Sequence, residues 1–319
     1  MKPKIYIAYK IPMSNNTLSK LNENFSVDFN QLPRLLSQNE LINNLKNSDG
    51  AIVLLSDNIN KRVIDALPNI KIYANYAVGY NNIDLKYATS KNITITNTPG
   101  VLSDATAETA FALMICVARK ITESDKFIRD GKFKGAMPDL MLGQALTGKT
   151  LGLIGAGLIG LSLAKKVSGF DMKILYHNRT INSELETKYN AKYVSKEELL
   201  KNSDFISIHT PLTEETFHLI SENEFGIMKK NAILINTARG PVVDEKALVK
   251  ALKLGQILGV GLDVFESEPI IRKELLEANN AVLLPHIGSA TLETRQNMAE
   301  TAVDNLTAFF NGQTPPNAL

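Results

Sequence analysis

The strongest constraint on the fold is a glycine-rich turn near the middle of the chain, between a strand-like and a helix-like segment. Residues 149–154, "KTLGLI", have the apolar run of a buried strand, and residues 158–167, "LIGLSLAKKV", follow with a helical pattern. Gly155, Gly157 and Gly160 lie at the turn. At such a turn the first glycine permits the sharp bend, the second lets a pyrophosphate approach the backbone, and the third lets the helix pack on the strand. The segment therefore predicts a dinucleotide-binding unit.

The start of this predicted helix is where we expect the pyrophosphate. The first amide groups of a helix have no partner within it, and the helix dipole favours a negative charge at that end. Leu158, Ile159 and Gly160 occupy these positions. We therefore expect their backbone N–H groups to contact the cofactor.

The end of the next predicted strand indicates which nucleotide binds. Asn178 lies eighteen residues after Gly160, where an aspartate would bind the ribose 2′-hydroxyl of NAD and repel the additional phosphate of NADP. Asn178 has no charge to repel that phosphate, and the adjacent Arg179 can donate paired hydrogen bonds to it. Such bonds predict a preference for NADPH of roughly tenfold to a hundredfold. If Arg179 is only a surface charge, NADH serves instead.

Strand-like and helix-like segments alternate along both halves of the chain. The strand-like runs are residues 4–9, 25–29, 51–55, 70–74 and 93–96 in the first half, and 150–155, 173–177, 205–210, 232–237, 257–262 and 281–285 in the second. This alternation is typical of parallel sheets covered by helices. We predict an α/β fold with two doubly wound parallel-sheet domains, one of five strands and a Rossmann domain of six.

Between the two halves lies an apolar helical segment, residues 103–121, "SDATAETAFALMICVARKI". Ser103 and Asp104 are good N-terminal caps, and the middle of the segment is apolar on nearly every face. A helix of this kind is buried on all sides. We expect it to lie between domains, between subunits, or both.

Composition excludes several classes of function. The net charge is +2 without a long basic run, which does not suggest nucleic-acid binding, and no apolar run is long enough to span a membrane. The single cysteine excludes a disulfide framework, and the start of the chain lacks the pattern of a signal peptide, so we expect a cytoplasmic protein. Four histidines and one cysteine show no spacing typical of a metal site.

Polar side chains follow three of the predicted strands in the second half. Arg239 follows residues 232–237, Asp263 and Glu268 follow residues 257–262, and His286 follows residues 281–285. Because ligands of open α/β sheets bind beyond the carboxyl ends of the strands, we expect these side chains to gather at the edge that holds the nucleotide.

This set of side chains suits the reduction of a 2-oxo acid. Arg239 can hold a carboxylate with paired hydrogen bonds. His286 can donate a proton to the carbonyl oxygen as hydride reaches the carbon. Glu268, hydrogen-bonded to that histidine, would favour its protonated form.

At these motifs the chain resembles the D-isomer-specific 2-hydroxyacid dehydrogenase family over essentially its whole length. The matching segments are "NYAVGYNNID", "NTPGVLSDATAE", "GLIGAGLIG", "HTPLTEETFHLI", "MKKNAILINTARGPVVDEKAL", "GVGLDVFESEP" and "LPHIGSAT". Within the family it is most similar to the glyoxylate/hydroxypyruvate reductases, through "LLSDNIN", "ANYAVGYNNID" and "NRT".

The resemblance implies specific roles. Arg239, Glu268 and His286 would form the catalytic triad, the backbone of Val78 and Gly79 would bind the substrate carboxylate, and Arg239 and His286 would also bind the substrate. The positions implied to contact the cofactor are Thr106, Thr210, Thr237 and Asp263, the last through the nicotinamide carboxamide. Residues 1–98 with 288–319 would form a flavodoxin-like substrate domain, residues 99–287 would form the Rossmann cofactor domain, and a cleft would lie between the two domains. The family is usually dimeric, so a homodimer is expected.

Two groups of alternatives remain open. A 3-phosphoglycerate dehydrogenase-like enzyme would need cations for a substrate phosphate, which "LLSDN" and "YAVGYNN" lack, and a formate dehydrogenase-like enzyme would have an amide in place of Glu268. A non-enzymatic, nucleotide-gated scaffold on the same fold is the alternative from another class.

The role of His209 also remains open. His209 either lines the cofactor site or has a structural hydrogen bond.

Overall fold

The computed structural model describes residues 1–319, and the chain folds into two compact units. The split unit comprises Met1–Leu102 and Ser289–Leu319, and the central unit comprises Ser103–Gly288. The sequence-based boundaries lay at residues 98/99 and 287/288.

The split unit is built on a five-stranded parallel sheet with the order β2-β1-β3-β4-β5. Its strands are β1 (Lys4–Ile7), β2 (Ser26–Phe29), β3 (Gly50–Val53), β4 (Ile72–Asn75) and β5 (Thr94–Thr96). Its helices are α1 (Asn15–Asn24), α2 (Gln38–Leu45), α3 (Lys61–Ala66), α4 (Leu85–Ser90) and α13 (Leu292–Phe310). The strand order is that of flavodoxin-like folds, as predicted.

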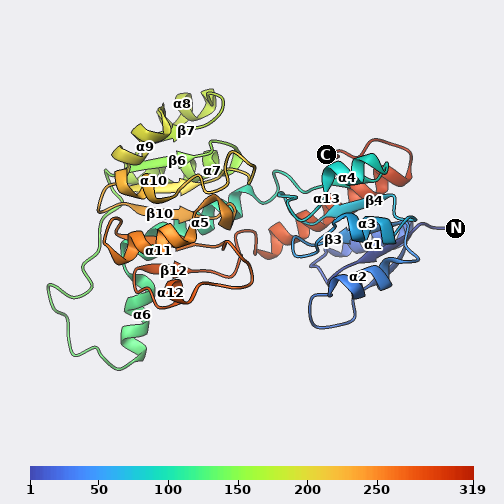
Figure 1. Cartoon of the computed structure of the whole chain (residues 1–319), viewed down its shortest axis with the longest axis horizontal. Helices are drawn as coiled ribbons and strands as arrows, with labels where there is room; N and C mark the ends of the chain where they lie inside the picture. The colour runs from blue at the N-terminus through green and yellow to red at the C-terminus, as the bar shows by residue number, and fades with distance from the viewer. The chain divides into compact units, whose positions relative to one another are not determined.

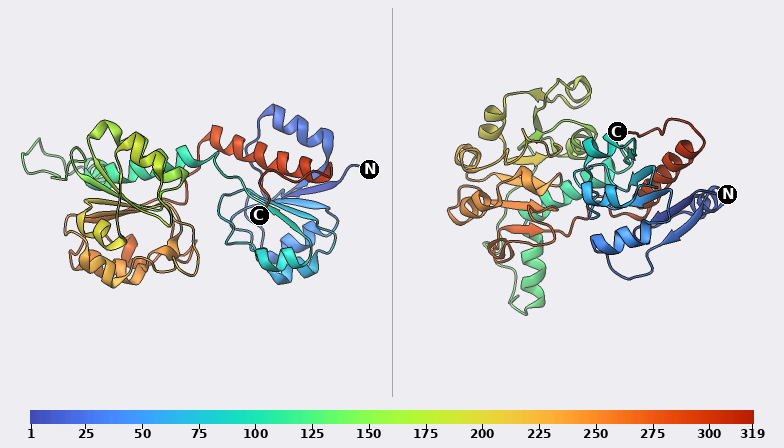
Figure 2. Two further views of the ribbon diagram at one scale, coloured as in Figure 1. Left: turned by 90° about the horizontal axis from the view of Figure 1, so that it is seen from above. Right: turned by 45° about the vertical axis from the view of Figure 1, so that its right-hand side comes forward.

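Helices cover both faces of this sheet (Figures 1 and 2). One face packs against α2, α3 and α4 through a buried cluster that includes Leu45, Val63 and Tyr73. The other face is covered by α1 and α13, and the predicted apolar stripe of α13 is buried at Met298 and Leu306. Strands β3 and β4 are buried along their whole length, which explains their apolar runs.

The central unit is built on a seven-stranded parallel sheet with the order β12-β11-β10-β9-β6-β7-β8. Its strands are β6 (Thr150–Ile154), β7 (Lys173–His177), β8 (Lys192–Tyr193), β9 (Phe205–Ile208), β10 (Ile233–Asn236), β11 (Gly259–Leu262) and β12 (Ala281–Leu283). The prediction of six strands is wrong by one, because β8 consists of two exposed residues at the sheet edge and has no apolar pattern. The prediction of two parallel-sheet α/β domains is confirmed.

The helices of the central unit also cover both faces of their sheet (Figure 2). They are α5 (Ser103–Ala118), α6 (Ile121–Arg129), α7 (Leu158–Val167), α8 (Ser183–Tyr189), α9 (Lys196–Asn202), α10 (Glu222–Ile227), α11 (Glu245–Lys253) and α12 (Lys273–Leu276), with short 3-10 helices η1 (Ser168–Phe170) and η2 (Gly240–Val242). Helices α5, α7 and α8 pack on one face, and α9, α10, α11 and α12 pack on the other.

The long apolar helix differs from the sequence-based expectation. It ends at Ala118, Lys120 adopts a left-handed backbone conformation, and a separate helix α6 begins at Ile121. Within this single chain α5 is not buried on all sides, because Glu108 and Ala112 are exposed. No helix of the protein is both long and apolar enough for a membrane span.

Candidate active site

The glycine-rich turn lies at the point where the strand order of the central sheet reverses. Strand β6 has β7 on one side and β9 on the other, so the chain winds outward in both directions from the β6–β9 pair. The turn at Gly155 follows β6, and His209 follows β9. Ligands of doubly wound sheets bind in the crevice at such a switch point.

The surroundings of each glycine of the turn fit its predicted role. A Cβ on Gly155, whose φ is +89°, would lie 2.7 Å from the carbonyl carbon of His209, so no side chain fits there. A Cβ on Gly160 would lie 2.8 Å from the carbonyl oxygen of Gly155, which explains the close packing of α7 on the strand. No atom lies within 4 Å of a Cβ on Gly157, so the backbone is open there.

Three buried polar atoms near this edge have no hydrogen-bond partner within the protein. They are His209 Nδ1, Thr210 Oγ1 and Thr237 Oγ1. A buried polar group without a partner costs about 1–3 kcal/mol, so these atoms are suited to bond to a polar ligand beside them. Together with the free amides at the start of α7, they fit a dinucleotide.

His209 has the structural hydrogen bond that was one of its two expected roles, and the other role, a place beside the cofactor, stays a prediction. Its Nε2 lies 2.9 Å from Ser207 Oγ, which is a structural hydrogen bond, while its Nδ1 has no partner. Burial lowers the pKa of His209 to about 4, so the ring is neutral at pH 7.

Asn178 and Arg179 follow β7, as the sequence predicted. The Asn178 side chain donates to the carbonyl oxygen of Thr180 at 3.1 Å. Arg179 is exposed and forms no hydrogen bond or ion pair within the chain. The pKa of Glu215 is lowered mainly by hydrogen bonds from Thr213 and the Glu215 backbone, and the charge of Arg179 makes a smaller contribution. The guanidinium is therefore available to a ligand.

His286 and Glu268 are brought together from separate loops. His286 Nδ1 lies 2.9 Å from Glu268 Oε2, and the second Glu268 oxygen accepts a hydrogen bond from the Phe265 amide at 2.9 Å. Burial opposes ionisation of Glu268, but His286, the Phe265 amide and the charge of Arg239 together hold its pKa below the usual range. The Nε2 of His286 has no partner, so it is free to exchange a proton with a ligand.

Arg239 reaches the same site from the end of β10. Its guanidinium is half-buried and donates to the carbonyl oxygen of Ala238 at 2.6 Å. Burial lowers the pKa of Arg239, and the negative charge of Glu268 opposes that effect. The next residue must be glycine, because a Cβ on Gly240 would lie 1.9 Å from the carbonyl carbon of Phe265. This close contact joins the Arg239 loop to the segment that carries Glu268.

Asp263 has a contact that the sequence did not reveal. It is buried, and its two carboxylate oxygens accept hydrogen bonds from the amides of Ile287 and Gly288, both at 2.7 Å. Burial raises the pKa of Asp263, and these two amides oppose the rise. Asp263 therefore holds the loop in which His286 has a φ of +56°.

Two further residues that the sequence did not single out, Asn236 and Glu266, support the site. Asn236 is buried, donates to the Arg239 carbonyl at 2.9 Å and accepts from the Ala238 amide at 3.0 Å. Glu266 lies within the Phe265–Glu268 segment. It bonds to His218 Nε2 at 2.8 Å and accepts a hydrogen bond from the Glu245 amide at 3.4 Å. Their signal in the sequence is weak because each acts on a neighbouring loop rather than on a ligand.

The remaining predicted residues lie at two places. Thr106 is buried near the start of α5, and its side chain would be 3.5 Å from a Cβ on Gly288. Val78 and Gly79 follow β4 in the split unit, where their carbonyl oxygens accept hydrogen bonds from Asn97 and Asn75.

The comparisons with known proteins decide the family. A sequence profile described as D-isomer specific 2-hydroxyacid dehydrogenase, NAD binding domain, matches residues 111–288. A glyoxylate reductase from Thermococcus litoralis is 50% identical over 323 residues, covering 100% of this chain and 97% of the relative. The chain belongs to the D-isomer specific 2-hydroxyacid dehydrogenase family. The predicted resemblance is thus confirmed.

Solved structures agree with this membership. A glyoxylate reductase from Paecilomyes thermophila is similar with a TM-score of 0.88 and 33% identity, covering 100% of this chain and 98% of the other. An NADPH-dependent glyoxylate/hydroxypyruvate reductase from Sinorhizobium meliloti, in complex with NADP and malonate, has a TM-score of 0.86 and 31% identity, covering 100% and 97%. As a family member, the chain is a nicotinamide-dependent oxidoreductase.

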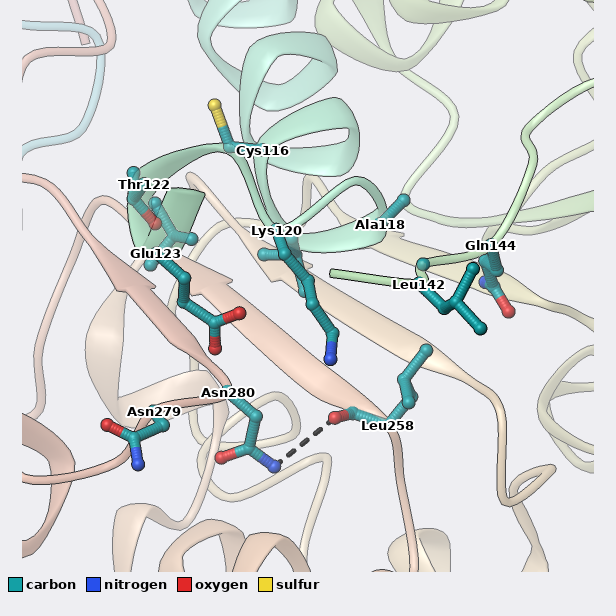
Figure 3. A pocket seen from close by; sticks show the side chains of 13 residues that line it. Cys116, Ala118, Lys120, Thr122, Glu123, Leu142, Gln144, Leu258, Asn279 and Asn280 are labelled. Atoms are coloured by element: carbon teal, nitrogen blue, oxygen red, sulfur yellow. Dashed lines mark hydrogen bonds between the residues drawn. The ribbon is translucent and has the colours of Figure 1, made fainter. Parts of the chain in front are cut away.

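The central unit also has a pocket that is separate from these residues. It has a volume of about 300 Å³ and is lined by side chains such as Cys116, Lys120, Leu142, Leu258 and Asn280 (Figure 3). Because Leu258 and Asn280 precede β11 and β12, the pocket lies at the opposite edge of the sheet from Asp263 and His286. It therefore takes no part in the chemistry of the candidate site.

Proposed function

We propose that the protein reduces glyoxylate or hydroxypyruvate to the corresponding 2-hydroxy acid, which for hydroxypyruvate is the D isomer, and that it prefers NADPH. The observation that carries this proposal is the 2.9 Å contact between His286 Nδ1 and Glu268, which leaves His286 Nε2 free at the carboxyl edge of the sheet that also carries the dinucleotide turn. The names of the relatives from Thermococcus litoralis and Sinorhizobium meliloti support the substrate class.

The protein's own residues manage the proton and the substrate carboxylate. His286, protonated on both nitrogens, donates the Nε2 proton to the carbonyl oxygen and is left neutral, to be reprotonated from solvent. The ionised Glu268 favours the protonated imidazole and fixes the ring, and Arg239 binds the carboxylate beside the reacting carbonyl. When bound, the nicotinamide supplies the hydride to the carbonyl carbon.

The same proposal assigns the residues that bind the cofactor. Gly155, Gly157 and the first amides of α7, at Leu158, Ile159 and Gly160, would hold the pyrophosphate. Thr106, Thr210 and Thr237 would bond to the cofactor, and Asp263 would accept from the carboxamide in addition to its two backbone bonds. Asn178 and the unpaired Arg179 would favour the 2′-phosphate of NADPH.

We also propose a homodimer that covers an apolar surface of the central unit. Helix α6 buries none of its residues and, with the segment that follows it, projects from the unit (Figure 1). The exposed apolar side chains of this region are Ile121, Ile128, Phe133, Met137 and Leu142. A surface of this kind on a soluble enzyme is typical of a protein interface. Sedimentation equilibrium should give twice the chain mass of 35.1 kDa, and Met137→Asp should reduce it to one chain.

The proposed compartment is the cytoplasm. The only cysteine, Cys116, is unpaired, and its pKa is raised by burial, so the thiol is not activated for disulfide exchange. A chain without disulfides is suited to a reducing compartment. Fractionation of the source cells with antibodies to the protein would test the assignment, and recovery with secreted proteins would contradict it.

Initial rates of NADPH and NADH oxidation test the proposed function. Glyoxylate, hydroxypyruvate and pyruvate are each supplied as substrate, and the loss of absorbance at about 340 nm is followed. We expect the highest kcat/KM with NADPH and either glyoxylate or hydroxypyruvate. A preference for NADH would keep the enzyme class and remove the role of Arg179, whereas no turnover of any 2-oxo acid would contradict the proposed function.

A further inference from the structure

The loop after β4 in the split unit presents two backbone amides that have no partner. The N–H groups of Val78 and Gly79 form no hydrogen bond, although the carbonyl groups around them are all engaged. Thr98 N donates to the Ala77 carbonyl at 3.0 Å, and Asn97 Nδ2 donates to the Val78 carbonyl at 2.8 Å. Asn75 Nδ2 donates to the Gly79 carbonyl at 2.9 Å.

These bonds fix the direction of the free amides. In a trans peptide, the carbonyl of one residue and the N–H of the next lie in one plane and point in opposite directions. The bond from Thr98 to Ala77 therefore directs the Val78 N–H away from the end of β5. In the same way, the bond from Asn97 to Val78 directs the Gly79 N–H away from Asn97.

Asn97 is itself held firmly by the end of the chain. Its carbonyl accepts from Asn305 Nδ2 at 3.2 Å, and its amide donates to the Asn317 carbonyl at 3.3 Å. Asn305, fully buried on α13, accepts from the Asn317 amide at 3.1 Å. Asn75 is held in turn by Asn82 Nδ2, which donates to its side-chain oxygen at 3.2 Å. The backbone from which the Asn97 side chain reaches the Val78 carbonyl is thus held on both sides, at its amide and at its carbonyl.

We infer that Asn97 is a positioning residue for substrate binding, which acts by holding the Val78–Gly79 peptide so that the Gly79 N–H binds the carboxylate of a small 2-oxo acid. The inference rests on the proposed function for the identity of the substrate, but the bonds that carry it lie within the split unit. Two successive amide N–H groups without partners favour an anion, and a carboxylate supplies acceptor oxygens for them. Asn75 supports the same loop through the following peptide.

Binding of oxamate tests the inference without depending on turnover. Oxamate has the carboxylate of glyoxylate, but an amide replaces the aldehyde, so it is not reduced. We would measure its Kd by calorimetry with the NADP-loaded protein. Asn97→Ala removes the bond to the Val78 carbonyl and should raise the Kd about tenfold, with the Kd for NADPH and the kcat for glyoxylate almost unchanged.

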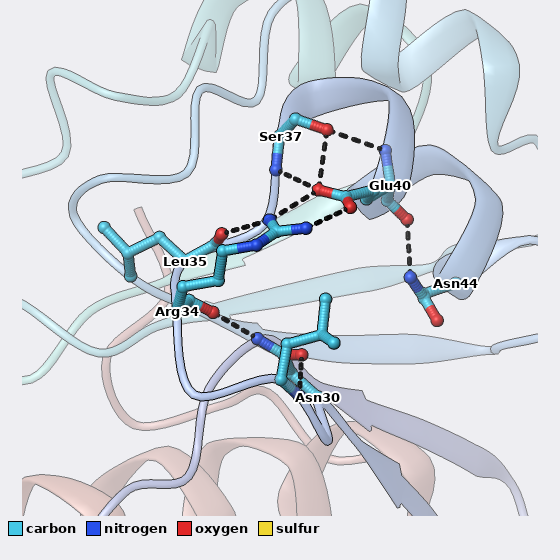
Figure 4. Close-up of polar contacts among 7 residues, drawn as sticks. Asn30, Arg34, Leu35, Ser37, Glu40 and Asn44 are labelled. Atoms are coloured by element: carbon cyan, nitrogen blue, oxygen red, sulfur yellow. Dashed lines mark hydrogen bonds and ion pairs between the residues drawn. The ribbon is translucent and has the colours of Figure 1, made fainter.

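Asn30 provides a matched control in the same unit. It is also buried, and its Nδ2 donates to a loop carbonyl, that of Arg34, at 2.8 Å (Figure 4). Asn30→Ala removes the same kind of bond from a loop that presents no predicted site residue. It should lower the melting temperature as Asn97→Ala does, but it should leave the Kd for oxamate unchanged.

The possible outcomes separate the inference from the proposed function. Equal effects of Asn97→Ala and Asn30→Ala on the Kd for oxamate, or no binding of oxamate by the unmodified protein, would overturn the inference. If oxamate binds and Asn97→Ala weakens it, but no 2-oxo acid is turned over, the inference stands and the reductase proposal fails. If Asn97→Ala does not fold, Asn97→Asp is used instead, because it keeps the shape of the side chain and removes the N–H donor. An unchanged Kd for oxamate in Asn97→Asp would also overturn the inference.

Discussion

Different kinds of polar group lie at the carboxyl ends of the strands in the two sheets. In the central unit the groups suited to chemistry are side chains, namely Arg239, Glu268 and His286. In the split unit the groups available at the end of β4 are backbone amides, and the polar side chains there face inward onto carbonyl groups. A group that must change its protonation state has to be a side chain, whereas an unchanging carboxylate can be bound by backbone.

Both edges nevertheless depend on buried polar side chains that hold loops. Asp263 binds two amides of the loop that carries His286, and Asn236 binds the loop that carries Arg239. Asn97 and Asn75 hold the Val78–Gly79 loop in the split unit. The difference lies in what each held loop presents: a titratable side chain in one case and a peptide N–H in the other.

The largest expected effect comes from removing the proton donor of the central unit. His286→Gln keeps a polar side chain of similar length but cannot transfer a proton, so kcat should fall by at least about a hundredfold. The Kd for NADPH, measured by fluorescence, should be nearly unchanged because His286 bonds only to Glu268. Unchanged turnover would show that His286 is not the proton donor, and the proposed difference between the two sheet edges would then be wrong.

Glu268→Gln should have the next largest effect. Its carboxylate is ionised at pH 7 and favours the protonated form of His286, so loss of that charge should reduce kcat about tenfold to a hundredfold. Steady-state reduction of glyoxylate with saturating NADPH measures the loss. A kcat equal to that of the unmodified protein would show that the charge of Glu268 is not needed for proton transfer.

Arg179→Ala should affect one cofactor and leave the chemistry of both edges intact. Because Arg179 has no partner in the chain, its removal should change no other contact. The KM for NADPH should rise about tenfold, while the KM for NADH, which lacks the 2′-phosphate, serves as the internal control. Equal changes with the two cofactors would argue against phosphate recognition.

The smallest expected effect on activity comes from the replacement of Asp57, a buried acid in the split unit. Burial raises its pKa to about 6, and the hydrogen bond that its carboxylate accepts from the Leu54 amide at 2.7 Å only partly opposes the rise. Because this value exceeds that of the unfolded chain, Asp57 favours folding below about pH 4 and loses that contribution as the pH rises through about 6.

Asp57→Asn should therefore raise the melting temperature at pH 8 and not at pH 4, with kcat/KM unchanged. The shift of about two pKa units corresponds to about 3 kcal/mol of unfolding free energy at pH 8. Calorimetric scans of both proteins at the two pH values would measure it. An equal gain at both pH values would mean that packing, and not charge burial, determines the effect.

The sequence predicted those parts of the fold and site that leave a local pattern. Buried strands such as β6 and β10 are apolar runs, the glycine turn has a fixed spacing, and Arg239, Glu268 and His286 each lie in a segment that follows a strand. Strand β8 was missed because two exposed residues have no such pattern.

The supporting contacts could not be predicted from the sequence. Asn97 and Val78 are 19 residues apart, and Asn305 and Asn97 are 208 apart, so their bonds exist only in the folded chain. Asparagine in a loop is common at turns, and nothing in its local sequence distinguishes one that holds a carbonyl from one that caps a turn. The bond from Asp263 to the His286 loop was missed for the same reason.

The most direct test of this division is steady-state reduction of glyoxylate by His286→Gln and Asn97→Ala, measured side by side with saturating NADPH. We predict that His286→Gln lowers kcat at least about a hundredfold with a similar KM, and that Asn97→Ala raises KM about tenfold with a similar kcat. If both variants lower kcat with no change in KM, or both raise KM alone, the two edges do not have the separate functions assigned to them.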